Sequence, residues 1–266
     1  MMSELERLRS ALRFLTSHVP GVSELTELIE NDEATLNLET NHASNPVQEL
    51  IGHSATNSAQ LQEALDKYKK RNHSKLEIGR FYERYLGYLF EQKGYQVAYK
   101  GIVEGLEDLG RDLICRKENE HLIVQAKCWS QRSEIHVKHI YQLHSSMLHY
   151  RFELREALKA AGAKQSVVRE RMKEQDVKAV LYSTTSLSDM ASEVVKHLNN
   201  TEYRIEPLNK DYPMVKCNIS KKDGSKRFHL PWDPQYDSIV IGNVSGEFYC
   251  DTIAEAESAG FLWTGN

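Results

Sequence analysis

The sequence predicts an α/β protein whose core runs from one helix through a meander of three strands to a helix, a strand and a last helix. Three observations predict this class: a long amphipathic pattern, a set of short apolar stretches, and a later alternation of helical and strand-like patterns. The segments concerned are 76–95 for the first helix, 95–100, 111–117 and 120–129 for the strands, then 134–158, 177–183 and 187–198.

The first helix is predicted over 76–95 because its apolar residues fall on one face and Gly94 supplies a stop. On a helical wheel Glu83 lies beside Phe90, at the border of that apolar face. Glu91 falls on the opposite side and is expected to face solvent. Glu83 is therefore the acid of this helix that we expect to lean over the edge of the sheet.

Changes in sequence character divide the chain into three parts. Residues 1–70 are polar and helical in pattern, which predicts a small helical module for interaction or for recognition, and a second copy or a partner subunit is expected to bind through it. Residues 71–210 carry the core, with a charged helical insertion at 151–176. Residues 211–266 show short β-like runs separated by Asp-Gly, Pro and Gly turns, which predicts a small α+β module.

Composition excludes several classes of protein. The 266 residues are 27% charged and 40% hydrophobic, as in ordinary globular proteins, and no apolar run approaches the ~20 residues needed to cross a bilayer. The formal net charge of −4 argues against sequence-blind nucleic-acid binding, although residues 71–210 hold a mild basic excess. Four scattered cysteines and the absence of a signal-peptide pattern favour a reducing cytoplasm.

The stretch "RDLICRKENEHLIVQAKCW", residues 111–129, places three polar residues inside two apolar runs. If the turn of a hairpin is centred between Glu118 and Asn119, Asp112 lies directly opposite Gln125, and facing Cβ atoms are then about 4.5–5.5 Å apart. Lys127 projects from the same face as Gln125 because side chains alternate along a strand. An acid, an amide and an ammonium thus gather on one face of the hairpin.

Such a set suits phosphodiester hydrolysis. The Asp112 carboxylate and the Gln125 amide oxygen are hard ligands that suit Mg²⁺ or Mn²⁺. Lys127 would orient a water or stabilise developing charge. Because an amide binds Mg²⁺ less strongly than a carboxylate does, a further acid is expected, and Glu83 is the candidate.

Simpler readings exist for these residues. An Asp and a Lys on paired strands often form only an ion pair. Elsewhere, Cys217, His229 and Cys250 would suffice for a zinc site only if the C-terminal module brought them together, and buried core cysteines are the more ordinary expectation.

The three core segments together resemble the Mrr-type branch of the PD-(D/E)xK nuclease superfamily, which includes restriction endonucleases. "IGRFYERYLGYLFEQKGYQV" is similar to the opening helix of the family, and the hairpin is similar to its Asp strand and to a Q-x-K form of its catalytic signature. "VKAVLYSTTSLSDMASEVVKHL" is similar to the later strand, the turn rich in Thr and Ser, and the helix. The resemblance implies a restriction-endonuclease-like core.

Carried over by position, the resemblance implies Asp112 as the metal-binding acid, Gln125 in the place usually held by Glu, and Lys127 as the catalytic lysine. Glu83 matches the acid of the opening helix, and Asp108 matches an acid that often precedes the central Asp. The Gln form occurs within this branch, so it does not by itself imply inactivity.

The implied activity is endonucleolytic cleavage of DNA with Mg²⁺ or Mn²⁺, in restriction or defence against foreign DNA. A homodimer or a partner subunit is expected, since one such site makes one cut. The alternative is a catalytically silent nuclease fold kept for DNA binding or for assembly, which the neutral Gln125 and the acidic net charge would suit.

Overall fold

The computed structural model describes residues 57–104 and 110–263, which belong to one compact unit of the chain, Asn57–Asn266. Most of the expected N-terminal module, residues 1–56, and the candidate acid Asp108 lie outside the described residues. The boundaries drawn between the three parts of the chain therefore remain predictions.

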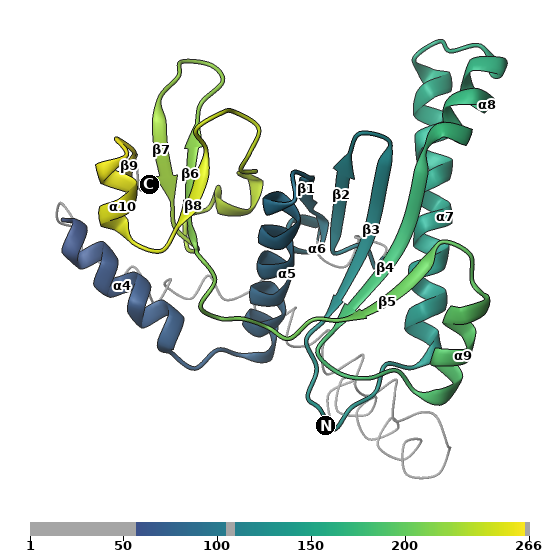
Figure 1. Cartoon of the computed structure of the whole chain (residues 1–266), viewed down its shortest axis with the longest axis horizontal. Helices are drawn as coiled ribbons and strands as arrows, with labels where there is room; N and C mark the ends of the chain where they lie inside the picture. The colour runs from purple at the N-terminus through teal and green to yellow at the C-terminus, as the bar shows by residue number, and fades with distance from the viewer. Residues whose placement is uncertain (1–56, 105–109, 264–266) are drawn as a thin grey trace, which may run out of the picture. The chain divides into compact units, whose positions relative to one another are not determined.

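The described residues form two sheets with helices around them (Figure 1). None of the helices in this part of the chain combines the length and the hydrophobicity that crossing a membrane requires. The helices are α4 (Ser58–Lys70), α5 (Lys75–Gln92), α6 (Lys100–Glu104), α7 (Val137–Ala160), α8 (Gln165–Glu174), α9 (Asp189–His197) and α10 (Ile253–Ser258), and a short 3-10 turn covers Tyr236–Ser238. The strands are β1 (Gln96–Tyr99), β2 (Leu113–Lys117), β3 (Glu120–Lys127), β4 (Asp176–Ser183), β5 (Thr201–Ile205), β6 (Val215–Ile219), β7 (Lys226–His229), β8 (Phe248–Cys250) and β9 (Leu262–Trp263).

The first sheet has the order β1-β2-β3-β4-β5, and the second has the order β8-β6-β7-β9. In the first sheet β1, β2 and β3 are antiparallel neighbours, whereas β3, β4 and β5 run parallel. The predicted core order of helix, three-strand meander, helix, strand and helix is confirmed. Helices α6 and α8 and the edge strand β5 are additions to it.

Helix α5 begins where its sequence can satisfy the free backbone amides. The Ser74 side chain accepts from the Glu77 backbone amide, and the Glu77 side chain accepts from the Ser74 amide, which makes a capping box. Further along, a Cβ on Gly87 would lie 2.1 Å from the Tyr99 hydroxyl oxygen of β1. Gly87 is therefore what lets α5 pack this closely on the first sheet.

The hairpin of β2 and β3 has the predicted register. Leu113 pairs with Val124 and Lys117 with Glu120, so the turn is centred between Glu118 and Asn119. Strand β2 begins two residues later than expected, directly after Asp112. The hairpin prediction is confirmed.

Helix α7 covers the opposite face of this sheet from α5 and crosses the predicted start of the insertion at 151–176 without a break. It ends at Ala160, and α8 folds back before β4 begins (Figure 1). Its buried side chains Ile140 and Leu143 pack with Ile123 of β3 and Leu181 of β4. The segment named as an insertion thus begins inside a core helix.

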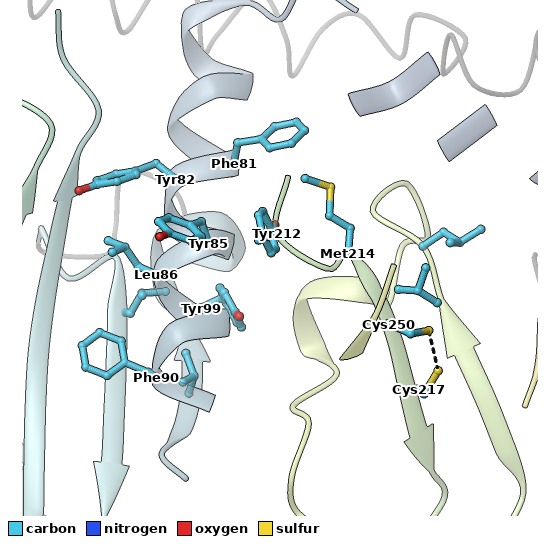
Figure 2. Packing of buried hydrophobic residues seen from close by; sticks show 14 of the residues in the cluster. Phe81, Tyr82, Tyr85, Leu86, Phe90, Tyr99, Tyr212, Met214, Cys217 and Cys250 are labelled. Atoms are coloured by element: carbon cyan, nitrogen blue, oxygen red, sulfur yellow. Dashed lines mark hydrogen bonds between the residues drawn. The ribbon is translucent and has the colours of Figure 1, made fainter. Parts of the chain in front are cut away.

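The second sheet packs against α5 on the side away from the first sheet. Figure 2 shows the Phe81 side chain of α5 turned toward Met214, which directly precedes β6, and Tyr212 lies beside α5 in the same hydrophobic cluster. The Tyr85 and Tyr212 rings lie 5.6 Å apart between centroids. One continuous hydrophobic cluster therefore joins α5 to both sheets.

The expectation that Glu91 faces solvent is wrong. Its side chain is buried, with 6% exposure, because the second sheet covers that side of α5. One carboxylate oxygen accepts from the Tyr99 hydroxyl at 3.1 Å, and the other accepts from the Ile241 amide at 3.1 Å and the Tyr249 hydroxyl at 2.7 Å. Burial nevertheless raises the pKa of Glu91 above its ordinary value.

Two cations complete this contact. Arg84 of α5 donates two hydrogen bonds of 2.7 Å to the Asp237 carboxylate. Lys216 of β6 is buried and donates to the backbone carbonyls of Tyr236 and Ile239 at 3.1 and 2.7 Å. Burial lowers the pKa of Lys216 to about 8. The C-terminal sheet is thus held to α5 by charged and aromatic contacts as well as by apolar packing.

Candidate active site

Asp112 stands at the entry to β2, where its side chain continues the strand ladder. One carboxylate oxygen, Oδ2, accepts a hydrogen bond of 2.5 Å from the backbone amide of Ala126 in β3. Continuing the register of the hairpin by one pair places Asp112 opposite Gln125. The hydrogen bond therefore fixes one oxygen of Asp112 and so orients the other.

That other oxygen lies close to the carboxylate of Glu83. A Cβ placed on Gly101 would lie 2.9 Å from Oε2 of Glu83 and 3.0 Å from Oδ1 of Asp112. Both carboxylates thus approach the same point beside the Gly101 backbone. The structure brings these two predicted residues together from α5 and from the start of β2.

Gly101 makes this approach possible because it has no side chain. Its backbone amide donates a hydrogen bond of 3.0 Å to the carbonyl oxygen of Asp112, which ties α6 to the entry of β2. Gly101 is not among the site residues predicted from the sequence. The signal that marks it is its position, two residues after the strand that precedes the central Asp.

Gln125 lies within β3 and is almost completely buried, with 1% exposure. Its Oε1 atom is buried and accepts no hydrogen bond from any residue that the structure describes. A buried acceptor left in this state costs about 1–3 kcal/mol. A ligand or a water at this atom would remove that cost. The amide oxygen is therefore available to coordinate a cation.

Lys127 is the last residue of β3 and pairs in parallel with Ser183, the last residue of β4. It is half-buried, and its ammonium forms neither a hydrogen bond nor an ion pair with another described residue. Its backbone carbonyl accepts from the Thr184 amide at 3.2 Å. Its place is the carboxyl edge of the parallel strands, which is where open α/β sheets bind ligands.

The loops that follow β3 and β4 are tied to each other at this edge. The Gln131 side chain donates a hydrogen bond of 2.6 Å to the Thr184 carbonyl, and the Thr184 hydroxyl donates one of 2.6 Å to the Trp129 carbonyl. Thr185 donates to the Ser133 carbonyl as well. These contacts hold the backbone that follows Lys127 against the backbone that follows Ser183.

The four candidates therefore divide into two groups. Glu83 and Asp112 are neighbours in space, and Gln125 is placed opposite Asp112 by strand register. Lys127 follows two residues later on the same face of β3, without a direct bond to the other three. In the described part of the chain there is no group of three or more His, Cys, Asp or Glu side chains that would hold a metal ion.

The donor set nevertheless fits a hard divalent cation. Two carboxylates that approach the same point can both supply oxygens to one cation. Carboxylate and amide oxygens are the ligands that Mg²⁺ and Mn²⁺ accept. The buried Oε1 of Gln125 would supply the third protein oxygen. Glu83, Asp112 and Gln125 are thus the residues that would hold the ion.

The cysteines and histidine of the second sheet form a different arrangement. The Sγ atoms of Cys217 and Cys250 lie 3.7 Å apart, and both thiols are free and buried (Figure 2). The Nε2 atom of His229 contacts the Asn218 side-chain oxygen at 3.0 Å. The two thiols therefore pack as core side chains.

Comparison with known proteins gives one family match. The family model Mrr_cat, described as restriction endonuclease, matches residues 75–205. No curated protein matches the chain.

Two solved structures show weak similarity. The protein of unknown function AF1548 has a TM-score of 0.32 and 12% identity, with 47% of this chain and 56% of that chain covered. The MspJI restriction endonuclease, in complex with a 27-mer oligonucleotide, has a TM-score of 0.29 and 15% identity, with 62% of this chain and 33% of that chain covered. The chain thus spans only part of the length of either structure.

Proposed function

Because residues 75–205 match the family model described as restriction endonuclease, we propose that this protein is a metal-dependent endonuclease that hydrolyses phosphodiester bonds in DNA. The family match supports a nuclease of restriction type. The residues of the site support the more specific proposal that the nuclease depends on a metal ion and hydrolyses DNA. The observation that carries it is the approach of the Glu83 and Asp112 carboxylates to one point beside Gly101.

Each residue has a definable part in the reaction. Asp112 and Glu83 would hold Mg²⁺ or Mn²⁺ together with Oε1 of Gln125. When bound, such an ion polarises the phosphate and lowers the pKa of a coordinated water. Lys127 would place its ammonium against the phosphate oxygens and stabilise the negative charge that develops on them.

The hydrogen bond from Ala126 contributes to this chemistry by preorganisation. With Oδ2 of Asp112 occupied by the backbone amide, Oδ1 is held toward Glu83 before any ligand arrives. Groups that are already in place cost no reorganisation during the reaction, which is the main source of electrostatic catalysis. Asp112 is therefore the residue whose loss should be most damaging.

The biological setting follows from the family. Restriction or defence against foreign DNA is the role we propose, with DNA as the substrate. One such site cuts one strand, so cleavage of both strands calls for a second copy or a partner subunit. The predicted N-terminal helices are the part of the chain that we assign to this contact.

The test is cleavage of supercoiled plasmid by the full chain with Mg²⁺ or Mn²⁺. Asp112→Asn and Lys127→Met should abolish nicking and linearisation. Asp176→Asn is a matched control, because Asp176 begins β4 at the opposite end of the same sheet. Equal loss in Asp176→Asn would contradict the assignment of the site.

The alternative of a catalytically silent DNA-binding or assembly subunit is separated by the same samples. It would give DNA binding by the wild type, equal binding by Asp112→Asn, and no metal-dependent cleavage of linear, branched or modified DNA. Cleavage that both site variants abolish would exclude it.

A further inference from the structure

The residue before Asp112 is anchored to a different element of the fold. Arg111 is buried, with 8% of its side chain exposed, and donates two hydrogen bonds to the Glu153 carboxylate of α7 at 2.7 and 3.1 Å. Two parallel N–H···O bonds fix the orientation of both planar groups. The peptide that leads into Asp112 is thereby tied to α7.

A second contact from α7 lies on the other side of Arg111. Gly110 has φ of +74°, and a Cβ on it would lie 2.8 Å from the Gln142 side-chain nitrogen and 3.1 Å from the Gln125 side-chain nitrogen. Side chains of α7 and β3 therefore close around this glycine. The three-residue entry to β2 is held by α7 at Gly110 and Arg111 and by β3 at Asp112.

Glu153 is suited to a permanent anchor because it stays ionised. Hydrogen bonding from Arg111 holds the pKa of Glu153 below its ordinary value. The His149 ring nitrogen Nδ1 also lies 3.1 Å from the Glu153 carboxylate. A buried guanidinium needs such a counter-charge, since an uncompensated buried charge is strongly unfavourable.

We propose that Glu153 is a positioning residue of the nuclease site: by holding Arg111, it fixes the backbone that presents Asp112 to the metal ion and to Glu83. This rests on the proposed function. Under this proposal the helical segment that begins at residue 151 contributes to the site, because Glu153 belongs to that segment. The backbone of Gln125 and Lys127 is held separately, because β3 pairs with β2 and β4.

The test compares Glu153→Gln with Glu156→Gln in the full chain. Glu156 lies one turn further along α7 and pairs with Arg155 and Lys159, so the same chemical change there leaves Arg111 untouched. Mn²⁺ binding to the DNA-free protein is measured by isothermal titration calorimetry, and plasmid cleavage is measured in parallel. Thermal unfolding sets a temperature at which all variants are folded.

Glu153→Gln should bind Mn²⁺ about tenfold or more weakly than the wild type and cleave correspondingly more slowly at fixed Mn²⁺, because a misplacement of about 1 Å can cost ~10²-fold in rate. Raising the Mn²⁺ concentration should recover part of the lost rate. Arg111→Lys, which keeps the charge but loses the paired bonds, should fall between the wild type and Glu153→Gln.

Equal Mn²⁺ affinity and equal cleavage in Glu153→Gln and Glu156→Gln would overturn the inference. If the wild type cuts and Asp112→Asn does not, that result leaves the proposed function standing. If the wild type neither binds Mn²⁺ nor cuts, the proposed function fails and the positioning role fails with it.

Discussion

Replacing Gly101 by Ala is the smallest change that should disturb the site while leaving the fold in place. The added Cβ would lie 2.9 Å from Oε2 of Glu83, 3.0 Å from Oδ1 of Asp112 and 3.2 Å from the Asp112 Cα. Ordinary contacts begin near 3.4 Å, so both carboxylates must retreat by a few tenths of an ångström. The retreat separates two groups whose closeness defines the proposed metal site.

The expected loss of cleavage rate is about 10- to 100-fold, since a displacement approaching 1 Å can cost ~10²-fold. Stability should change little, because Ala in a helix is favoured over Gly by about 0.8–1.0 kcal/mol, which offsets part of the crowding. The assays are plasmid cleavage at saturating Mn²⁺ and urea unfolding of the same samples.

Gly79→Ala is the matched control. Gly79 lies in α5, one turn before Glu83, and a Cβ there meets no atom within 4 Å. This variant should gain about 0.5–1 kcal/mol of stability and cleave at the wild-type rate. If Gly101→Ala cleaves as fast as Gly79→Ala, the two carboxylates do not act together at this point and the reasoning is refuted.

Three further outcomes follow from other contacts. Gln125→Met removes the buried oxygen that accepts no hydrogen bond, so the free energy of unfolding of the metal-free protein, measured with urea, should rise by about 1 kcal/mol. The same variant should bind Mn²⁺ more weakly, and unchanged Mn²⁺ affinity would count against a ligand role. Burial lowers the pKa of His229 to about 4, below about 6.5 for an unfolded chain, so the unfolded state binds the extra proton between these values and stability should fall by about 1–3 kcal/mol as pH drops from 6.5 toward 4. His229→Gln should flatten that dependence, and an equally steep fall in this variant would assign it to other groups. Asp237→Asn breaks the paired bonds to Arg84, whose side chain is 12% exposed, and should cost about 2–4 kcal/mol, which an unshifted urea midpoint would contradict.

The hairpin and its polar residues could be predicted because the information is local. Alternation of side chains and one short turn determine which residue of β3 lies opposite each residue of β2. From the register alone, Asp112 and Gln125 were expected to face each other, and the strands pair in that register. The helical wheel likewise placed Glu83 at the border of the apolar face, from which it reaches the Gly101 backbone.

Long-range contacts were beyond such reasoning. Glu91 is expected in solvent because it lies opposite the apolar face of its own helix, yet its partners Ile241 and Tyr249 come from about 150 residues later in the chain. The bond between Arg111 and Glu153 joins a loop to the middle of a helix, and neither local pattern marks the other. In both cases tertiary packing decided the environment of a charged side chain.

Metal-dependent cleavage of plasmid by the wild type, beside Asp112→Asn and the control Asp176→Asn, tests the central claim most directly. Cleavage that needs Mg²⁺ or Mn²⁺, that survives Asp176→Asn and that disappears in Asp112→Asn is the expected result. Cleavage that persists in Asp112→Asn would contradict the assignment of the site, and a wild type that binds DNA without ever cutting it would contradict the assignment of the activity.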